Sequence, residues 1–259
     1  MSTLPFPRSE LTIENYRENG IFFLTGVLTE NDVKALNAEA TQLWRTQEHL
    51  VPQNLRVGLR TDENDLILLD RIDPVYDISK VFDDLNHHPK LISIAEKLLG
   101  CPVIVMKEKL IYKEPGTSGF GLHRDGPYVD VGGVPAHEII SCTIALNEAT
   151  RENGAIEFFP KIQDDAFEAP PGEPRDILDS AVEDKRSILA EIQAGDIIFF
   201  SAMVPHRSGP NRSKQSRRTY TVNYAPAKYT NCRDGYYQKR FEQQENERAS
   251  QIEGPFFVH

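Results

Sequence analysis

The sequence has few cysteines, no long apolar run and no excess of basic residues, and each absence excludes a class of protein. Its three cysteines in 259 residues form no CxxC pair, which argues against a disulfide framework and indicates reduced thiols. No stretch of about 18 apolar residues exists, so we expect no membrane-spanning helix. The formal net charge of −10 disfavours nucleic acid as a partner, because phosphate binding needs a basic face. We therefore expect a cytoplasmic protein without nucleic-acid or membrane partners, whose oligomeric state the sequence does not determine.

The chain changes near Gly100 from segments with helical periodicity to short strands separated by turns. Before it, apolar spacing and capping residues predict a strand at 21–24 and helices at 11–19, 29–44, 78–86 and 89–99. After it, strands are predicted at 102–112, 138–146, 155–159, 196–200 and 217–225, and a solvated helix at 234–250. We expect one α+β, mainly β domain over residues 1–259. It would comprise a helical part at about 9–100, a β-sandwich or barrel at about 102–227 and a helical tail at 228–259.

A histidine and an aspartate two residues apart stand at the end of an extended run. Side chains at i and i+2 of a strand share a face, so His123 and Asp125 can reach one metal ion while Arg124 points elsewhere. Two histidines and one carboxylate form the ligand set of non-haem Fe(II) oxygenases, which leaves coordination positions open. With 39 acids among 259 residues, chance alone gives about 0.9 His-x-acid matches. A surface histidine beside an aspartate in a turn is therefore the alternative.

A second histidine and a polar strand face strengthen the metal hypothesis. His206 follows the apolar strand at 196–200. A residue just after a buried strand lies at the mouth of a β-barrel, where it can serve as a metal ligand. The next strand alternates, with Arg217, Thr219, Thr221 and Asn223 on one face and Arg218, Tyr220, Val222 and Tyr224 on the other. The first face suits a polar interior, in which Arg217 can bind a carboxylate through two hydrogen bonds. A surface arginine within a basic run is the alternative, with Arg218 as the substitute if the register differs by one residue.

Together these residues resemble the phytanoyl-CoA dioxygenase family of Fe(II)- and 2-oxoglutarate-dependent oxygenases. The similarity lies in His123-x-Asp125, in Ser208-x-x-Asn211-x-Ser213 and in Arg217, eleven residues past His206. The similarity covers most of the chain, because three further segments share it: Tyr16 to Leu28, Lys113-Glu114-Pro115-Gly116 and Glu152-Asn153-Gly154-Ala155-Ile156.

The resemblance implies a double-stranded β-helix (jelly-roll, cupin-like) core with N-terminal helices packed on one sheet. It assigns His123, Asp125 and His206 to Fe(II), and Arg217 with Ser208 to the distal carboxylate of 2-oxoglutarate. Thr143 is a weaker candidate for the same carboxylate. With O2 as the further reactant, the implied reaction hydroxylates an unactivated C–H bond of a small molecule and releases succinate and CO2. Because Asp125 is present, halogenation is not expected, and a non-catalytic relative acting as a sensor or binding module is the alternative.

The substrate is the least determined part of this interpretation. Lys107, Lys109 and Lys113 share strand parity in an acidic chain. They either line a basic pocket for a small anionic substrate, such as a carboxylate or phosphonate, or belong to a solvated edge strand. Arg124, which stands inside the metal motif, and Tyr128, which follows it, are further substrate-binding candidates. Two departures from the family pattern affect this region, since Arg124 stands where the family often has Gln, and Pro160-Lys161-Ile162-Gln163 where it commonly has Pro-Gly-Ser-His.

Overall fold

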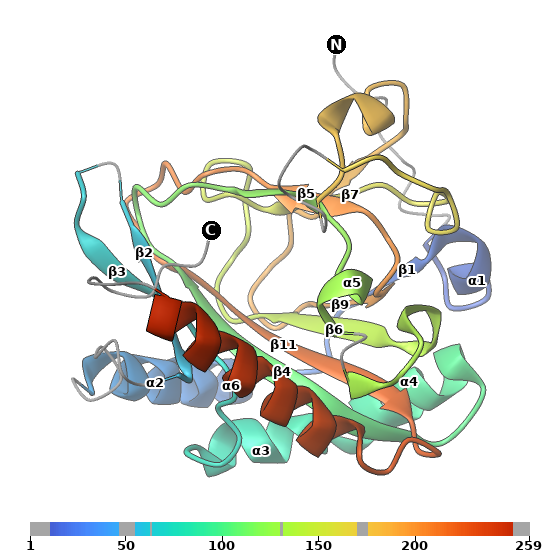
Figure 1. The fold of residues 1–259 in the computed structure, drawn as a ribbon, viewed down its shortest axis with the longest axis horizontal. Helices are drawn as coiled ribbons and strands as arrows, with labels where there is room; N and C mark the ends of the chain where they lie inside the picture. Colours follow the sequence, from blue (N-terminus) through green and yellow to red (C-terminus); the bar gives the residue numbers. More distant parts are fainter. Residues whose placement is uncertain (1–10, 47–54, 63, 130–131, 170–175, 251–259) are drawn as a thin grey trace.

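Two antiparallel β-sheets packed face to face form the core of the protein (Figure 1). The computed structural model describes residues 11–46, 55–62, 64–129, 132–169 and 176–250. Within these ranges the larger sheet has seven strands in the order β1-β9-β6-β11-β4-β3-β2, and the smaller has four in the order β5-β10-β7-β8. From β4 to β11 the chain moves back and forth between the sheets, which is the topology of the double-stranded β-helix that the resemblance implied.

The strands of the larger sheet are Ile21–Leu24 (β1), Val57–Thr61 (β2), Ile67–Ile72 (β3), Val103–Lys113 (β4), Ile140–Ala145 (β6), Ile197–Ser201 (β9) and Arg217–Pro226 (β11). Those of the smaller sheet are Phe120–His123 (β5), Ile156–Phe158 (β7), Ile188–Leu189 (β8) and His206–Ser208 (β10). The α-helices are Tyr16–Asn19 (α1), Glu30–Arg45 (α2), Lys80–Asn86 (α3), Pro89–Leu99 (α4), Gly126–Val129 (α5) and Cys232–Ser250 (α6). Short 3-10 helices occupy Ala136–Glu138 and Asp179–Val182.

The central strand β11 separates a polar interior from a layer of helices. Its outward side chains contact α2 and α3, which with α4 cover the outer face of the larger sheet (Figure 1). Tyr220 donates a hydrogen bond to the side-chain oxygen of Asn86 at 2.6 Å, and Tyr224 donates to the Asn86 carbonyl at 2.9 Å. Arg218 points the same way and donates to the Thr41 hydroxyl at 2.7 Å. The predicted division between the two faces of this strand is therefore confirmed.

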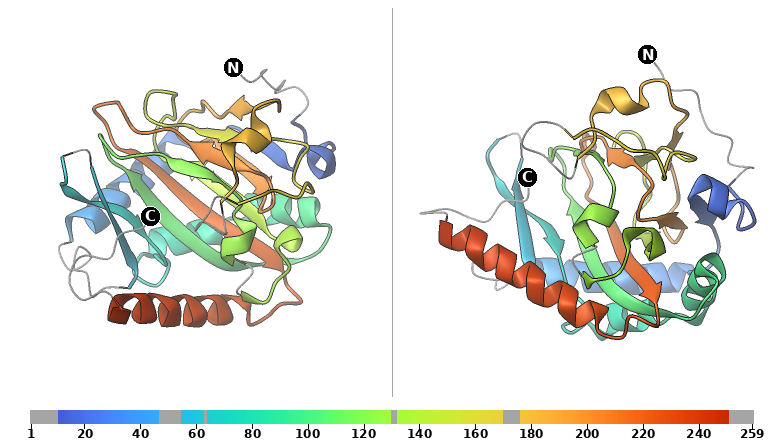
Figure 2. Two further views of the ribbon diagram at one scale, coloured as in Figure 1. Left: turned by 45° about the horizontal axis from the view of Figure 1, so that its top comes forward. Right: turned by 45° about the vertical axis from the view of Figure 1, so that its right-hand side comes forward.

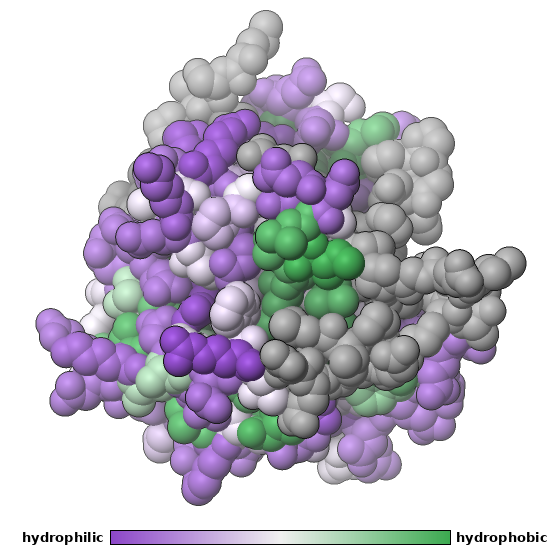
Figure 3. Space-filling model, turned by 90° about the vertical axis from the view of Figure 1, so that its left-hand side faces the viewer, coloured by the Kyte–Doolittle hydropathy of each residue, from purple (hydrophilic) through white to green (hydrophobic). Residues whose placement is uncertain are grey.

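The first hundred residues contain more β-structure than helical periodicity indicates. The strands β2 and β3 form a hairpin that extends the larger sheet beyond β4, and neither was expected from the sequence. The helix expected at 11–19 is reduced to the four residues of α1, which ends where Gly20 adopts a left-handed conformation. Figure 3 shows the hairpin side of the molecule, where a small apolar patch lies in a hydrophilic surface; Leu66 and Ile67 of the hairpin are exposed.

The C-terminal helix α6 is docked against β4 (Figure 2). The prediction of a solvated helix is therefore wrong for the face that contacts the sheet. Tyr236 and Tyr237 are buried, and Arg233 forms an ion pair with the fully buried Glu108 at 2.7 Å. These contacts use phenolic and charged groups, so the helix has no apolar stripe by which sequence periodicity would have revealed its docking. None of the described helices is long and apolar enough to span a membrane.

A fully buried carboxylate fixes α6 to the larger sheet. Asp73 accepts a hydrogen bond from Tyr237 at 3.0 Å and forms ion pairs with Arg240 at 2.7 Å and with Lys107 at 3.7 Å. Burial alone would raise the pKa of Asp73, but Arg240, Lys107 and Arg71 lower it to about 2. Because the pKa is depressed in the folded state, this group stabilises the fold above pH ~4, and the contribution is lost as the pH falls toward 2.

Asp73→Asn is expected to lower the free energy of unfolding by about 3–5 kcal/mol, because it leaves two buried cations without their counter-charge. Chemical denaturation monitored by circular dichroism at pH 7 measures the change. Asp84→Asn, which removes an exposed carboxylate paired with Lys80, is the matched control and is expected to cost less than about 1 kcal/mol. Equal losses in the two variants would contradict a structural role for Asp73.

Candidate metal centre

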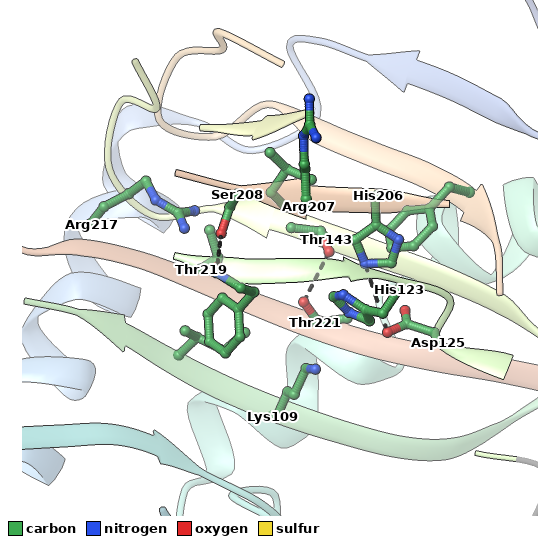
Figure 4. A pocket seen from close by; sticks show the side chains of 14 residues that line it. Lys109, His123, Asp125, Thr143, His206, Arg207, Ser208, Arg217, Thr219 and Thr221 are labelled. Carbon is green, nitrogen blue, oxygen red and sulfur yellow. Dashed lines mark hydrogen bonds and ion pairs between the residues drawn. The ribbon is translucent and has the colours of Figure 1, made fainter. Parts of the chain in front are cut away.

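Two histidines and an aspartate from different parts of the chain meet between the two sheets (Figure 4). His123 ends β5, Asp125 follows it, and His206 begins the neighbouring strand β10, where it pairs directly with His123. One potential ligand atom from each side chain lies within 4.8 Å of the others. The i, i+2 spacing had placed His123 and Asp125 on one face, and the pairing of β5 with β10 brings His206 to them.

The backbone holds both imidazoles in the orientation that metal binding requires. His123 Nδ1 is 2.7 Å from the Gly121 carbonyl, and His206 Nδ1 is 3.0 Å from the Val204 carbonyl. A carbonyl only accepts hydrogen bonds, so each Nδ1 carries a proton, and Nε2 is the ring nitrogen left for a metal ion. Burial and the neighbouring His123 lower the pKa of His206 to about 4, which leaves this imidazole neutral at physiological pH. His206 is therefore in the neutral form that coordinates a metal ion, and both rings have Nε2 available for it.

The carboxylate of Asp125 is positioned by a chain of polar side chains on the larger sheet. Ser141 donates a hydrogen bond to Asp125 Oδ2 at 2.6 Å, and the Asn223 amide donates to the Ser141 hydroxyl at 2.8 Å. Asp125 Oδ1 lies 3.9 Å from His206 Nε2. Burial would raise the pKa of the Asp125 carboxyl, but His206, Lys109, His123 and the Ser141 hydroxyl hold it below its usual range. One ionised carboxylate and two imidazoles fit Fe(II) in chemistry and in number.

The floor of the pocket is a grid of side chains from three adjacent strands of the larger sheet. Strand pairing places Lys109 of β4 beside Thr221 of β11, and Thr221 beside Thr143 of β6. The hydroxyls of Thr221 and Thr143 are 2.9 Å apart. Figure 4 shows this row between the three candidate metal ligands and Arg217. Thr143, proposed from the sequence for a distal carboxylate, thus lies in the middle of the pocket.

An arginine at the far end of the pocket has no anionic partner in the described part of the chain. Arg217 is 3% exposed, and its Nε donates to the Asn153 carbonyl at 3.3 Å. No carboxylate within the described ranges forms an ion pair with it, and burial lowers its pKa to about 10. Because an unpaired buried charge is costly, a guanidinium in this environment is suited to a carboxylate ligand. The Asn-Gly turn singled out in the sequence supplies the carbonyl that orients it.

A buried lysine lies beside Arg217 and contacts Ser208 of the pocket lining. Lys113 pairs in register with Arg217, and its ammonium donates to the Ser208 hydroxyl at 2.8 Å. Burial, together with Arg217 and Arg60, lowers the pKa of Lys113 to about 6. Gly154 makes this packing possible, since a Cβ there would lie 2.8 Å from Lys113 Cε and 2.3 Å from the Gly209 carbonyl. The alternation of side chains along the strand had placed Lys113 on the same face as Lys107 and Lys109. It did not indicate that the three lysines have different roles.

The remaining candidate residues are distributed differently. Lys109 lines the pocket, whereas Lys107 lies outside it and donates to Tyr236 at 2.8 Å. Arg124 points away from the metal ligands, donates to the carbonyls of Ile162 and Asp165 at 3.2 and 2.6 Å, and stacks on Phe167. Tyr128 packs edge-on against His123 and donates to Asp176 at 3.0 Å.

Comparison with known proteins identifies similarity along most of the chain. The family model described as Phytanoyl-CoA dioxygenase (PhyH) matches residues 16–219. A methylphosphonate hydroxylase of Gimesia maris is 34% identical over 154 residues, which are 57% of this chain and 55% of that protein. A 2-aminoethylphosphonate dioxygenase of an uncultured bacterium is 26% identical over 244 residues, 92% of this chain and 89% of that protein. The match to the first relative thus spans about half of its length.

Solved structures with the same fold have lower sequence identity. EctD from S. alaskensis, in complex with 2-oxoglutarate and 5-hydroxyectoine, superposes with a TM-score of 0.72 at 18% identity over 100% of this chain and 82% of EctD. The epimerase SnoN, in complex with Fe3+, alpha ketoglutarate and nogalamycin RO, superposes with a TM-score of 0.70 at 21% identity over 85% and 84%. Both likenesses support the double-stranded β-helix core.

Proposed function

The chain belongs to the phytanoyl-CoA dioxygenase family of Fe(II)- and 2-oxoglutarate-dependent dioxygenases, and from this premise we propose that it hydroxylates a C–H bond of a small anionic molecule, with phosphonates as the substrate class. The observation that carries the proposal is one pocket with a ligand-competent His-Asp-His set at one end and an unpaired buried arginine at the other. The names of two relatives, a methylphosphonate hydroxylase and a 2-aminoethylphosphonate dioxygenase, support the substrate class.

In this proposal His123, Asp125 and His206, which line the pocket, would hold Fe(II). Bound Fe(II) would supply the activation of O2 and the oxidative decarboxylation of 2-oxoglutarate. In the overall reaction R–H, O2 and 2-oxoglutarate give R–OH, succinate and CO2, so that one oxygen atom of O2 enters R–OH and the other enters succinate. The protein contributes two imidazoles, an oriented carboxylate and a pocket that positions both organic reactants.

The distal carboxylate of 2-oxoglutarate is proposed to bind Arg217, Lys113 and Ser208. Arg217 can donate two parallel hydrogen bonds to one carboxylate, and Lys113 adds a second positive charge. Thr143 would contact the middle of the cosubstrate from the pocket floor.

The free thiols of Cys101, Cys142 and Cys232 support the cytoplasmic location expected from the sequence.

Succinate formation tests the proposed function directly. The Fe(II)-loaded protein is mixed with 2-oxoglutarate under anaerobic conditions, where a weak visible charge-transfer band is expected, and is then exposed to O2 with methylphosphonate or 2-aminoethylphosphonate. Succinate and the hydroxylated phosphonate should appear in equal amounts. A band without substrate-dependent succinate would favour a sensor or binding module, and no band at all would contradict the metal and cosubstrate site.

The affinity for 2-oxoglutarate is expected to fall as the pH rises above about 6. In the free protein Lys113, with a pKa of about 6, is largely neutral at higher pH. A bound carboxylate favours its charged form, so binding takes up a proton and weakens by up to about tenfold per pH unit. Titration of the Mn(II)-loaded protein with 2-oxoglutarate from pH 6 to pH 9 measures the slope. Lys113→Met should flatten it, and an unchanged slope in this variant would exclude Lys113 as the cause.

A further inference from the structure

A second pocket-lining cation, Lys109, has no partner among the residues that the structure describes. Lys109 is partly buried and lines the pocket, yet it forms no hydrogen bond or ion pair with any residue that the structure describes. Arg207, which also lines the pocket, is neutralised by Glu157 and Asp179, each at 2.8 Å. Arg217 lies at the other end (Figure 4). Lys109 is therefore the cation available to an anion bound near the metal ligands.

Strand geometry separates Lys109 from the cosubstrate end of the pocket. It precedes Lys113 by four residues on β4, so their Cα atoms are about 13 Å apart along the strand. Register places Lys113 beside Arg217 but Lys109 beside Thr221, in the middle of the floor. Figure 4 shows the Lys109 side chain extending from β4 apart from Arg217 and below His123 and Asp125. The pocket thus offers two distinct positions for anionic groups.

The surroundings of Lys109 favour an anion over a neutral ligand. Burial and the nearby Lys107 lower its pKa, as does Arg71, and Asp125 acts in the opposite direction. Lys107 is already bound to Asp73 and Tyr236, so its own charge is satisfied. If Asp125 binds a metal ion, its charge is shared with that ion and Lys109 is left without compensation. A negatively charged group would remove the cost of burying this ammonium.

We propose that the Lys109 ammonium binds the phosphonate group of the substrate and thereby determines which C–H bond faces the metal centre. The inference rests on the proposed function and names the residue that would recognise the substrate class. An anionic phosphonate matches a pocket position that offers one free ammonium better than a neutral molecule does. The aliphatic part of the substrate would then extend from the floor toward His123 and His206.

Binding to the Mn(II)–2-oxoglutarate complex provides a test that does not depend on turnover. Isothermal titration should detect methylphosphonate and no binding of its uncharged dimethyl ester, with the monoanion methanesulfonate weaker than methylphosphonate. Lys109→Met should weaken methylphosphonate at least about tenfold, as expected for loss of a charge-assisted hydrogen bond. Lys109→Arg should restore part of the affinity, because it retains the charge at this position.

The control variant is Lys97→Met, which removes an exposed lysine of α4 on the opposite side of the larger sheet. It should bind methylphosphonate like the unmodified protein. In the Fe(II) enzyme, Lys109→Met should keep the visible band with 2-oxoglutarate and the KM for 2-oxoglutarate, while the KM for the phosphonate rises. This split distinguishes a substrate ligand from a residue that only maintains the fold.

Three outcomes would overturn the inference. In the first, no anion of the set binds the unmodified complex; in the second, Lys109→Met binds methylphosphonate normally. In the third, Lys109→Met raises the KM for 2-oxoglutarate instead, which would assign the lysine to the cosubstrate. Absence of the visible band in the unmodified protein with Fe(II) and 2-oxoglutarate would instead contradict the proposed function as a whole. A failure of this inference can therefore be distinguished from a failure of the proposed function.

Discussion

Replacing His206 with alanine is expected to reduce succinate formation about 10³-fold or more. The variant loses one of two imidazoles in a three-ligand set, and metal catalysis contributes several kcal/mol of transition-state stabilisation. Succinate is quantified after a fixed time with excess 2-oxoglutarate, and bound iron is measured in the same sample. Chelation of the unmodified protein should have the same effect and should be reversed by added Fe(II).

His87→Ala is the matched control, because His87 is an exposed histidine at the end of α3, far from the pocket. It should retain full iron content and full activity. Thermal unfolding of both variants checks that the fold is preserved, since His206 is buried. A His206→Ala protein that keeps its iron and more than a tenth of the activity would show that this residue is not a ligand.

Arg217→Ala is expected to raise the KM for 2-oxoglutarate about 100-fold or more with a smaller change in kcat. The variant removes a buried charged group that can bind the distal carboxylate at two points, a loss of about 2–5 kcal/mol in binding. The measurement is initial succinate production over a range of 2-oxoglutarate concentrations. Lys113 remains in the variant and limits the loss, so activity at saturating cosubstrate should persist.

Arg218→Ala gives the sharpest comparison, because it removes the same side chain one residue later on the same strand. Arg218 lies on the opposite face of β11, where it contacts Thr41 and stacks on Tyr112. Its replacement should reduce stability modestly and leave the KM for 2-oxoglutarate unchanged. A larger KM effect in Arg218→Ala than in Arg217→Ala would show that the faces of β11 have been assigned wrongly.

The alternation of side chains along β11 predicted correctly which of its residues face the interior of the pocket. The polar set that begins at Arg217 faces inward and the tyrosines between these residues face the helices, as the two-residue period of a strand requires. Helix caps were equally informative, because Thr29 and Gly100 mark the start of α2 and the end of α4. These are local signals, and they do not depend on what lies opposite.

Partners from distant segments could not be predicted in the same way. Lys107 and Lys109 have the same residue type, strand and parity, yet one is neutralised by Asp73 and Tyr236 and the other is free to bind a ligand. Asp73 is 34 residues before Lys107 and Tyr236 is 129 residues after it. Only the docking of α6 and β3 against β4 distinguishes the two lysines.

The two departures from the family pattern turn out to be in contact. Arg124 donates to the carbonyl of Ile162, which belongs to the segment that replaces the usual Pro-Gly-Ser-His. Arg124 had been proposed as a substrate ligand because it stands between two candidate metal ligands. In the structure it instead joins the metal motif to the loop after β7, an interaction that neither departure indicated when considered separately.

Two residues without any side chain constrain the cosubstrate end of the pocket. A Cβ at Gly119 would lie 2.0 Å from the Ser208 carbonyl oxygen, just as one at Gly154 would collide with the Gly209 carbonyl. The Ser208–Gly209 backbone is thus enclosed from both sides by glycines. Any side chain introduced at Gly119 or Gly154 would therefore have to move this backbone and, with it, the Ser208 side of the pocket. The shape of the cavity here is a property of the main chain, while its charge is a property of Arg217 and Lys113.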